Sequence, residues 1–208
     1  MSLFSRPKPR LALVNTVTVD LDADHVRIIT TGTQDKTFMK QYAKKFPKNL
    51  IGLPWKIDFH IKMPALTDLE IDTGSGPIKL SGVEGALRIN ALESDANLTL
   101  TGGDAVITIQ RGKINLRIPG RSWHGLGADI RVGSGDFTVE LPPDFNADIN
   151  ADALRNGQIE NSYPGLVPRD RDTSTPRSLR GRAGSGGADL RFTVGDGSLH
   201  IKQVSPQL

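Results

Sequence analysis

The chain has 208 residues, which suits one domain with a continuous core. Its 22 glycines and 13 prolines, with only 5% aromatic residues, favour a turn-rich β protein over a helical core. A net charge of +3 is too small to indicate nucleic-acid binding, and we predict none. The absence of cysteine excludes disulfides, thiolate catalysis and sulfur-ligated metals.

The N-terminal part is basic, because residues 1–62 hold eleven of the lysines and arginines against five acids. Its apolar run Leu11–Val14 is shorter than the roughly 7 to 15 residues of a signal-peptide core. No stretch elsewhere approaches the ~18 apolar residues of a membrane span. We therefore expect a flexible segment over residues 1–10, no transmembrane segment and, on this ground, a cytoplasmic protein.

Apolar residues alternate with polar ones in two parts of residues 11–63. Val17 to Leu21 and Val26 to Ile28 flank the turn-forming sequence Asp-Ala-Asp-His, which predicts a hairpin or two successive strands. Alternation returns between Trp55 and Lys62, which predicts a half-buried strand.

Between these stretches the apolar period changes to that of a helix. Five apolar residues recur at three- and four-residue spacing: Phe38, Met39, Tyr42, Ala43 and Phe46. Asp35 suits the N-cap and Pro47 ends the run, so we predict a helix over about residues 35–46. Its opposite face carries Lys36, Lys40 and Lys44, which are candidate partner contacts or, alternatively, a solvated surface.

From residue 64 onward the sequence repeats short strands and turns. Five apolar pairs follow one another at steps of nine, eleven, nine and nine residues: Ile78/Leu80, Leu87/Ile89, Leu98/Leu100, Ile107/Ile109 and Leu116/Ile118. Steps this regular indicate an internal repeat. Glycine permits the positive φ that tight corners need. The candidate turn glycines are Gly74, Gly76, Gly133, Gly135, Gly157, Gly195 and Gly197.

These short repeats favour an all-β, right-handed β-solenoid forming a single domain over residues 11–204. Residues 11–63 would supply its first strands, and the predicted helix would cap an end whose free backbone groups invite pairing. A two-sheet β-sandwich built from hairpins is the alternative.

Residues 164–187 differ from the repeats in composition. They are rich in proline, glycine and arginine and show little apolar periodicity, which predicts a mobile loop. Arg177 and Arg180 are candidate contacts for an acidic partner, although nearby acids also fit a solvated excursion. Residues 205–208 form a tail after the last predicted strand.

The order of motifs resembles a known family. TGSGPIKLSGVEGALRI is followed by VGSGDFTVELPPDFNADINADALRNGQIENSYP, a loop, and GSGGADLRFTVGDGSLHIK. This order is similar to the bacterial "putative adhesin" family, also called toastrack domains, over roughly residues 55–203. Pro77 departs from the usual Asp after Gly76. The resemblance implies a right-handed β-solenoid of unknown function attached to bacterial envelope proteins, and it brings no catalytic residues.

Metal and phosphate chemistry has little support in the sequence. Acids beside the turns could form a calcium ladder, but only one occurs per turn, which also fits turn capping: Asp72, Asp104, Asp136 and Asp196. The glycine turns lack the helix and the lysine of a phosphate loop. The histidines are scattered and form no ligand motif: His25, His60, His124 and His200. We expect no metal, no cofactor and no catalytic residue.

Three functions are compatible with this pattern. The one that we favour is a non-catalytic structural or interaction module of the bacterial envelope, binding an unknown protein or an envelope polysaccharide and acting as a monomer or weak oligomer. A carbohydrate-binding or carbohydrate-cleaving solenoid is the first alternative, and a self-assembling scaffold is the second. Trp123 is the best single candidate for stacking on a sugar or docking a partner, unless it packs against the fold.

Overall fold

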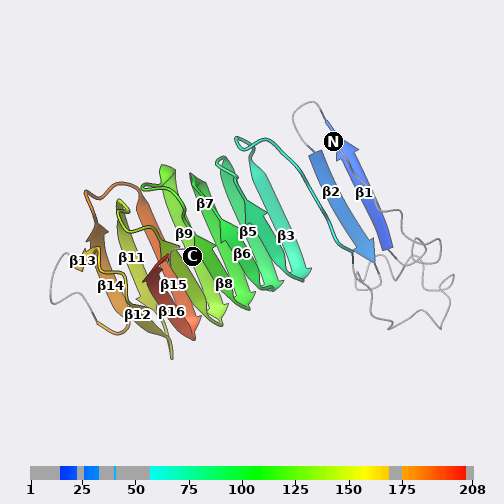
Figure 1. Cartoon of the computed structure of the whole chain (residues 1–208). Helices are drawn as coiled ribbons and strands as arrows, with labels where there is room; N and C mark the ends of the chain where they lie inside the picture. The colour runs from blue at the N-terminus through cyan, green and yellow to red at the C-terminus, as the bar shows by residue number, and fades with distance from the viewer. Residues whose placement is uncertain (1–14, 23–25, 33–39, 41–56, 169–174, 205–208) are drawn as a thin grey trace. The chain divides into compact units, whose positions relative to one another are not determined.

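The computed structural model describes residues 15–22, 26–32, 40, 57–168 and 175–204 (Figure 1). Almost all regular structure in these residues is β-strand, which confirms the predicted all-β class. The chain divides into two compact units, Met1–Lys62 and Met63–Leu208. The single domain expected over residues 11–204 stays a prediction.

The described part of the first unit is a hairpin. Strand β1 (Asn15–Leu21) pairs antiparallel with β2 (Val26–Gly32), with Val19 opposite Ile28. This pairing confirms the hairpin predicted from the alternation of apolar residues.

Several predicted features of the chain lie outside the described residues. They include the flexible segment 1–10, the tail 205–208 and the helix over residues 35–46, of which only Lys40 is described. Lys40 is helical and exposed.

Residues 57–62 do not form the strand predicted from their alternation, so that prediction is wrong here. No described strand pairs with this segment, and Phe59 and Ile61 are 43% and 50% exposed. Alternation shows that a segment could bury one face, but a strand also needs a neighbour for its backbone hydrogen bonds. Trp55 and Lys56 lie outside the described residues.

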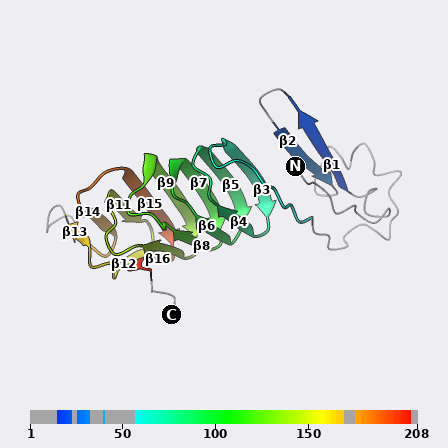
Figure 2. The same ribbon diagram turned by 45° about the horizontal axis from the view of Figure 1, so that its top comes forward.

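The second unit consists of two facing sheets (Figure 1, Figure 2). The large sheet has eight strands: β3 (Leu69–Ser75), β5 (Ala86–Glu93), β7 (Gly102–Arg111), β9 (His124–Ser134), β11 (Ala147–Ala153), β13 (Leu166–Pro168), β14 (Ser178–Ala183) and β15 (Asp189–Asp196). The small sheet has six: β4 (Ile78–Ser81), β6 (Ala96–Thr99), β8 (Ile114–Arg117), β10 (Phe137–Leu141), β12 (Gln158–Asn161) and β16 (Ser198–Gln203).

The chain alternates between the two sheets, and each pass through both is called a coil here. In the large sheet Ile71 pairs with Ile89, Ile89 with Ile107 and Ile107 with Ile130, all in parallel. Partners in the first coils are 18 residues apart, so the step of about nine residues in the sequence is half a coil. The unit thus combines the facing sheets of a sandwich with the stacked parallel strands expected of a solenoid. The right-handed sense stays a prediction.

The coils do not stack in chain order throughout. Strand β15 lies between β9 and β11, and β16 lies between β10 and β12, so the last coil of the chain fills a place inside the stack. The large sheet then ends with β14 antiparallel to β11 and β13 antiparallel to β14.

The mobile loop predicted over residues 164–187 is wrong in part, because β13 and β14 lie within it. Leu166, Leu179 and Ala183 are buried, and Gly181 shares the inward-facing side of β14. Alanine and glycine add little to an apolar pattern, so the alternation in this strand was hidden. Residues 169–174 lie outside the described part of the chain.

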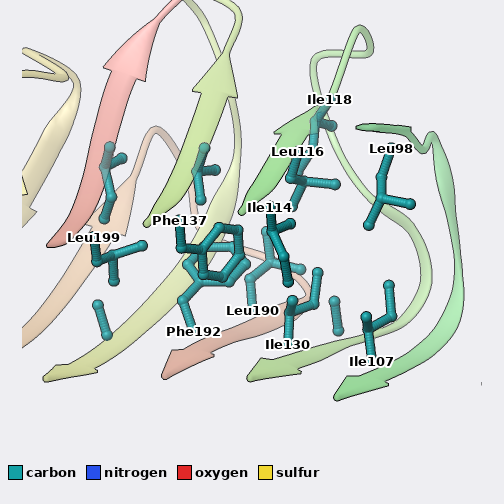
Figure 3. Packing of buried hydrophobic residues seen from close by; sticks show 14 of the residues in the cluster. Leu98, Ile107, Ile114, Leu116, Ile118, Ile130, Phe137, Leu190, Phe192 and Leu199 are labelled. Carbon is teal, nitrogen blue, oxygen red and sulfur yellow. The ribbon is translucent and has the colours of Figure 1, made fainter. Parts of the chain in front are cut away.

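Apolar side chains from both sheets fill the space between them (Figure 3). Six that are fully buried are Ile107, Ile130, Phe192, Leu116, Phe137 and Leu199. The rings of Phe137 and Phe192 meet edge to face, with centroids 5.3 Å apart and planes at 81°. Each such side chain contributes about 1.5–3 kcal/mol through burial.

A stack of tight corners joins the large sheet to the small one. Gly76, Gly135 and Gly197 have φ between 127° and 137° there, the positive φ that a tight corner needs and that glycine adopts readily. A methyl group on Gly135 would overlap the carbonyl oxygen of Gly112 in the neighbouring coil. Ser94 occupies a corner of the same stack and donates its hydroxyl hydrogen to the Gly76 carbonyl at 2.6 Å. Each corner therefore rests on the corner of the next coil.

The other predicted turn glycines lie beside these corners or elsewhere. Gly74, Gly133 and Gly195 each stand one residue before the end of a strand, β3, β9 and β15 respectively. Gly157 follows the turn after β11.

Candidate functional site

The outer face of the large sheet is polar and crosses all the coils. Because side chains alternate in direction along a strand, the residues between the buried ones point outward. Asp72, Asn90, Thr108, Arg131 and Thr193 form one outward row, since each pairs in register with the next. The row runs across the strands rather than along them.

Two shallow depressions lie on this face and meet at Thr108 and Gln110. Together they form what we call the transverse groove, which crosses β3, β5, β7, β9, β15 and the end of β11. Its lining includes Gly74, Gly133 and Gly195 beside the outward row. Since glycine has no side chain, these positions lower the surface and expose the backbone.

The rims of the groove are partly apolar. Leu92 on β5 and Leu154 after β11 are 60% and 53% exposed, and both line the groove. Large aliphatic side chains at such exposure offer contact area to a bound molecule without contributing to the core.

One end of the groove holds two exposed arginines, each paired with an aspartate. Arg131 donates from Nε and Nη2 to Asp129, and this hydrogen bond and charge raise the pKa of Arg131 above its usual value. Arg155 donates from Nη2 to the Gly133 carbonyl at 2.8 Å and lies 3.0 Å from an Asp196 carboxylate oxygen. The two side chains are 59% and 63% exposed. They are held in place by their partners yet remain open to solvent.

The other end of the groove is lined by amide and hydroxyl groups and by the carboxylate of Asp72. Asn90 donates from Nδ2 to Asp72 at 2.9 Å, linking adjacent strands. Thr108 and Gln110 lie on the next strand. Gln110 has no hydrogen-bond partner within the described ranges, so its side-chain amide is available to a bound molecule.

The residues singled out from the sequence are not brought together. Trp123 is only 5% exposed and donates its indole hydrogen to the Gly103 carbonyl at 3.0 Å, so its ring packs against the fold. Arg180 binds Asp152 through two carboxylate oxygens, and Arg177 is exposed before β14. Lys40 is exposed, while Lys36 and Lys44 lie outside the described residues. None of these described partner-contact candidates lines the groove, whereas the predicted turn glycines Gly74, Gly133 and Gly195 do.

The groove residues could have been found from the 18-residue step. Asp72, Asn90 and Thr108 stand one step apart in the sequence. Asn90 and Thr108 adjoin apolar pairs and were not among the candidates, and Asp72 was considered only as a turn cap or a calcium ligand. The step itself was hidden, because the apolar pairs of the two sheets alternate at half that interval.

Acidic and histidine side chains show no ligand cluster in the described part of the chain, where no group of three could hold a metal ion. The acids beside the turns have other partners: Asp72 accepts from Asn90, Asp136 lies 3.9 Å from Lys113, and Asp196 pairs with Arg155. His200 lies 3.0 Å from Glu160 on the small sheet.

No helix among the residues described here has the length and apolar content to cross a membrane.

No family model and no curated protein matches the chain. Among solved structures it is similar to one from Clostridium sporogenes that is named "a putative cell adhesion protein". The two are 16% identical, with a TM-score of 0.43, and the match covers 67% of this chain and 93% of that one.

Proposed function

We propose that the chain is a non-catalytic, adhesin-like interaction module of the bacterial envelope that binds its partner on the outer face of the large sheet. The observation that carries this proposal is the transverse groove, which crosses five adjacent strands, reaches the turn after β11 and is lined largely by exposed polar and charged side chains. A groove so open and shallow suits an extended partner better than an enclosed small substrate.

The rigidity of the face supports a binding role. Its strands belong to a stack whose core residues are fully buried, so the outward side chains keep a fixed spacing. Binding to a surface that is already ordered avoids the cost of ordering loops.

The pairing of the acids supports a non-catalytic role. Asp129, Asp152 and Asp189 on this face each bind an arginine. A carboxylate that already accepts hydrogen bonds from a guanidinium is less free to contact a substrate.

The envelope setting is supported by the motif order that resembles the toastrack family. The order runs from TGSGPIKLSG to the terminal GDGSLHIK and covers the whole second unit. The resemblance supplies the expected compartment, and the groove supplies the expected binding face.

The experiment is a pull-down with the full chain against envelope and cytosolic fractions of the source organism. We expect envelope material to be retained. Thr108→Tyr places a ring in the groove and should reduce retention, whereas Thr138→Tyr, outward on the small sheet, should not. Retention of cytosolic material only, or equal effects of the two variants, would contradict the proposal.

A further inference from the structure

We propose that the transverse groove binds an acidic polysaccharide, with sugar carboxylates placed at Arg131 and Arg155. This inference rests on the function proposed above and names the ligand class of the same face.

The dimensions of the groove suit a polymer. It crosses five neighbouring strands, β3 to β15, and reaches the turn after β11, and at about 4.8 Å between strands its length is about 24 Å. It is shallow along this length, so no single sugar would be enclosed. Many weak contacts repeated along a polymer would give useful affinity where one would not.

The two arginines have hydrogen-bond donors left for a ligand although each is paired with an aspartate. Arg131 uses Nε and Nη2 for Asp129, and Arg155 uses Nη2 for Gly133 and Asp196. A guanidinium carries five N–H donors, so Nη1 of each side chain still has donors that no acceptor in the described residues takes. Their charge and planar shape match a carboxylate.

The remainder of the groove suits the neutral parts of a sugar chain. Asn90, Thr108, Gln110 and Thr193 present amides and hydroxyls that both donate and accept, as sugar hydroxyls do. The exposed side chains of Leu92 and Leu154 can contact the C–H faces of the rings.

An acidic peptide is less well matched than a polysaccharide. A peptide gains most by adding a strand to a free sheet edge through main-chain hydrogen bonds. Most of the groove lies over interior strands, from β5 to β15, whose edges are already paired on both sides. A single-stranded nucleic acid is also disfavoured, because no aromatic ring lines the groove for base stacking.

The test measures binding of the full chain to three acidic polysaccharides, polygalacturonate, alginate and hyaluronate, beside neutral dextran and poly-L-glutamate. We expect at least one acidic polysaccharide to bind and the other two probes to bind at least about tenfold more weakly. Arg131→Gln with Arg155→Gln should weaken binding about a hundredfold, since each loses a charge-assisted hydrogen bond.

The matched control removes the same charge outside the groove. Arg117→Gln with Lys202→Gln, both on the small sheet, should change binding by no more than about twofold. Lys202 lies 3.2 Å from a Glu140 carboxylate oxygen, so this pair of substitutions also controls for the loss of an ion pair. Circular dichroism and thermal melting verify that each variant folds.

Three results would overturn the inference: no binding to any acidic polysaccharide, equal binding of poly-L-glutamate, or equal losses in the groove and control variants. If envelope material is still retained by the Arg131→Gln and Arg155→Gln variant, the inference fails and the proposed interaction function stands. If the unaltered chain retains no envelope material, the proposed function itself fails.

Discussion

The first four coils and the C-terminal part of the second unit are both built from short strands, but these strands follow different orders in the stack. From β3 to β10 each coil lies on the one before it in the sequence. After β12 the chain returns, and β15 and β16 enter between coils already passed. The comparison shows that a regular repeat fixes where strands occur without fixing their order in the stack.

The inserted coil has neighbours on both sides, whereas the first coil has a described neighbour on one side only. Phe192 of β15 is fully buried between Ile130 and Ala151, while Ile71 of β3 is partly exposed. The place filled last along the chain is thus among the most buried. Contacts at 39 residues' separation, as between Asn150 and Asp189, should also make this part slower to form.

The largest expected effect follows from that burial. Phe192→Ala should lower the free energy of unfolding by about 3–5 kcal/mol, because it leaves a cavity beside Phe137. Ile71→Ala in the first coil should cost clearly less, since the partly exposed site can fill with water. Urea unfolding followed by circular dichroism measures the free energy of unfolding of both variants. Equal losses would show that the inserted coil contributes no more to stability than the first coil.

The second prediction compares the first glycine of one Gly-Ser-Gly motif, Gly74, with the second glycine of another, Gly135. Gly135→Ala should cost about 2–4 kcal/mol, because it combines a strained positive φ with overlap on the Gly112 carbonyl. Gly74→Ala should change stability by less than about 1 kcal/mol, since no heavy atom lies within 4 Å of its added methyl group and its φ is not positive. Thermal melting of the two variants, each beside the unaltered chain, compares them directly. A harmless Gly135→Ala would show that the corners do not rest on one another.

The third prediction concerns the residue that seemed best suited to a partner. Trp123→Phe should cost about 1–3 kcal/mol, because the buried Gly103 carbonyl loses its donor. Binding of envelope material should not change once the variant is folded, since the ring is buried. Pull-down and unfolding measurements on the same variant test both expectations. A loss of binding without a loss of stability would show that Trp123 contacts the partner.

The predictions made from the sequence succeed where local pattern decides the outcome. The hairpin around Val19 and Ile28 and the repeated strands from Ile78 to Ile118 follow from alternation and glycine spacing, and the structure confirms both. Residues 57–62 and 178–183 were predicted wrongly, because pairing partners decide whether a segment is a strand and these lie far away in the sequence.

The arginine end of the candidate site could not be predicted from sequence pattern for the same reason. Arg131 and Arg155 belong to different elements and line one groove only because β15 lies between β9 and β11. Nothing in the local sequence around either arginine indicates that β15 lies between β9 and β11. The single-residue candidates had instead been chosen for chemical type, as Trp123 was, and burial removed that one from the surface.

The smallest expected effect concerns the ion pairs at the end of the large sheet. Arg180 binds Asp152 through two oxygens and donates to the Ala151 carbonyl at 3.0 Å, with both side chains 36% exposed. Arg180→Ala should therefore cost about 1 kcal/mol or less, because solvent screens a pair at this exposure. Arg191→Ala, at 64% exposure and without a backbone acceptor, should cost less than about 0.5 kcal/mol.

Urea unfolding at low and high salt tests this ranking, and the Arg180 loss should shrink as salt rises. A salt-independent loss larger than about 2 kcal/mol would mean that Arg180 acts by packing. In that case β14 would be a rigid closure of the stack, like the inner coils. The expected small loss would instead mean that β14 is held mainly by the buried side chains of Leu179 and Ala183 and by its pairing with β11.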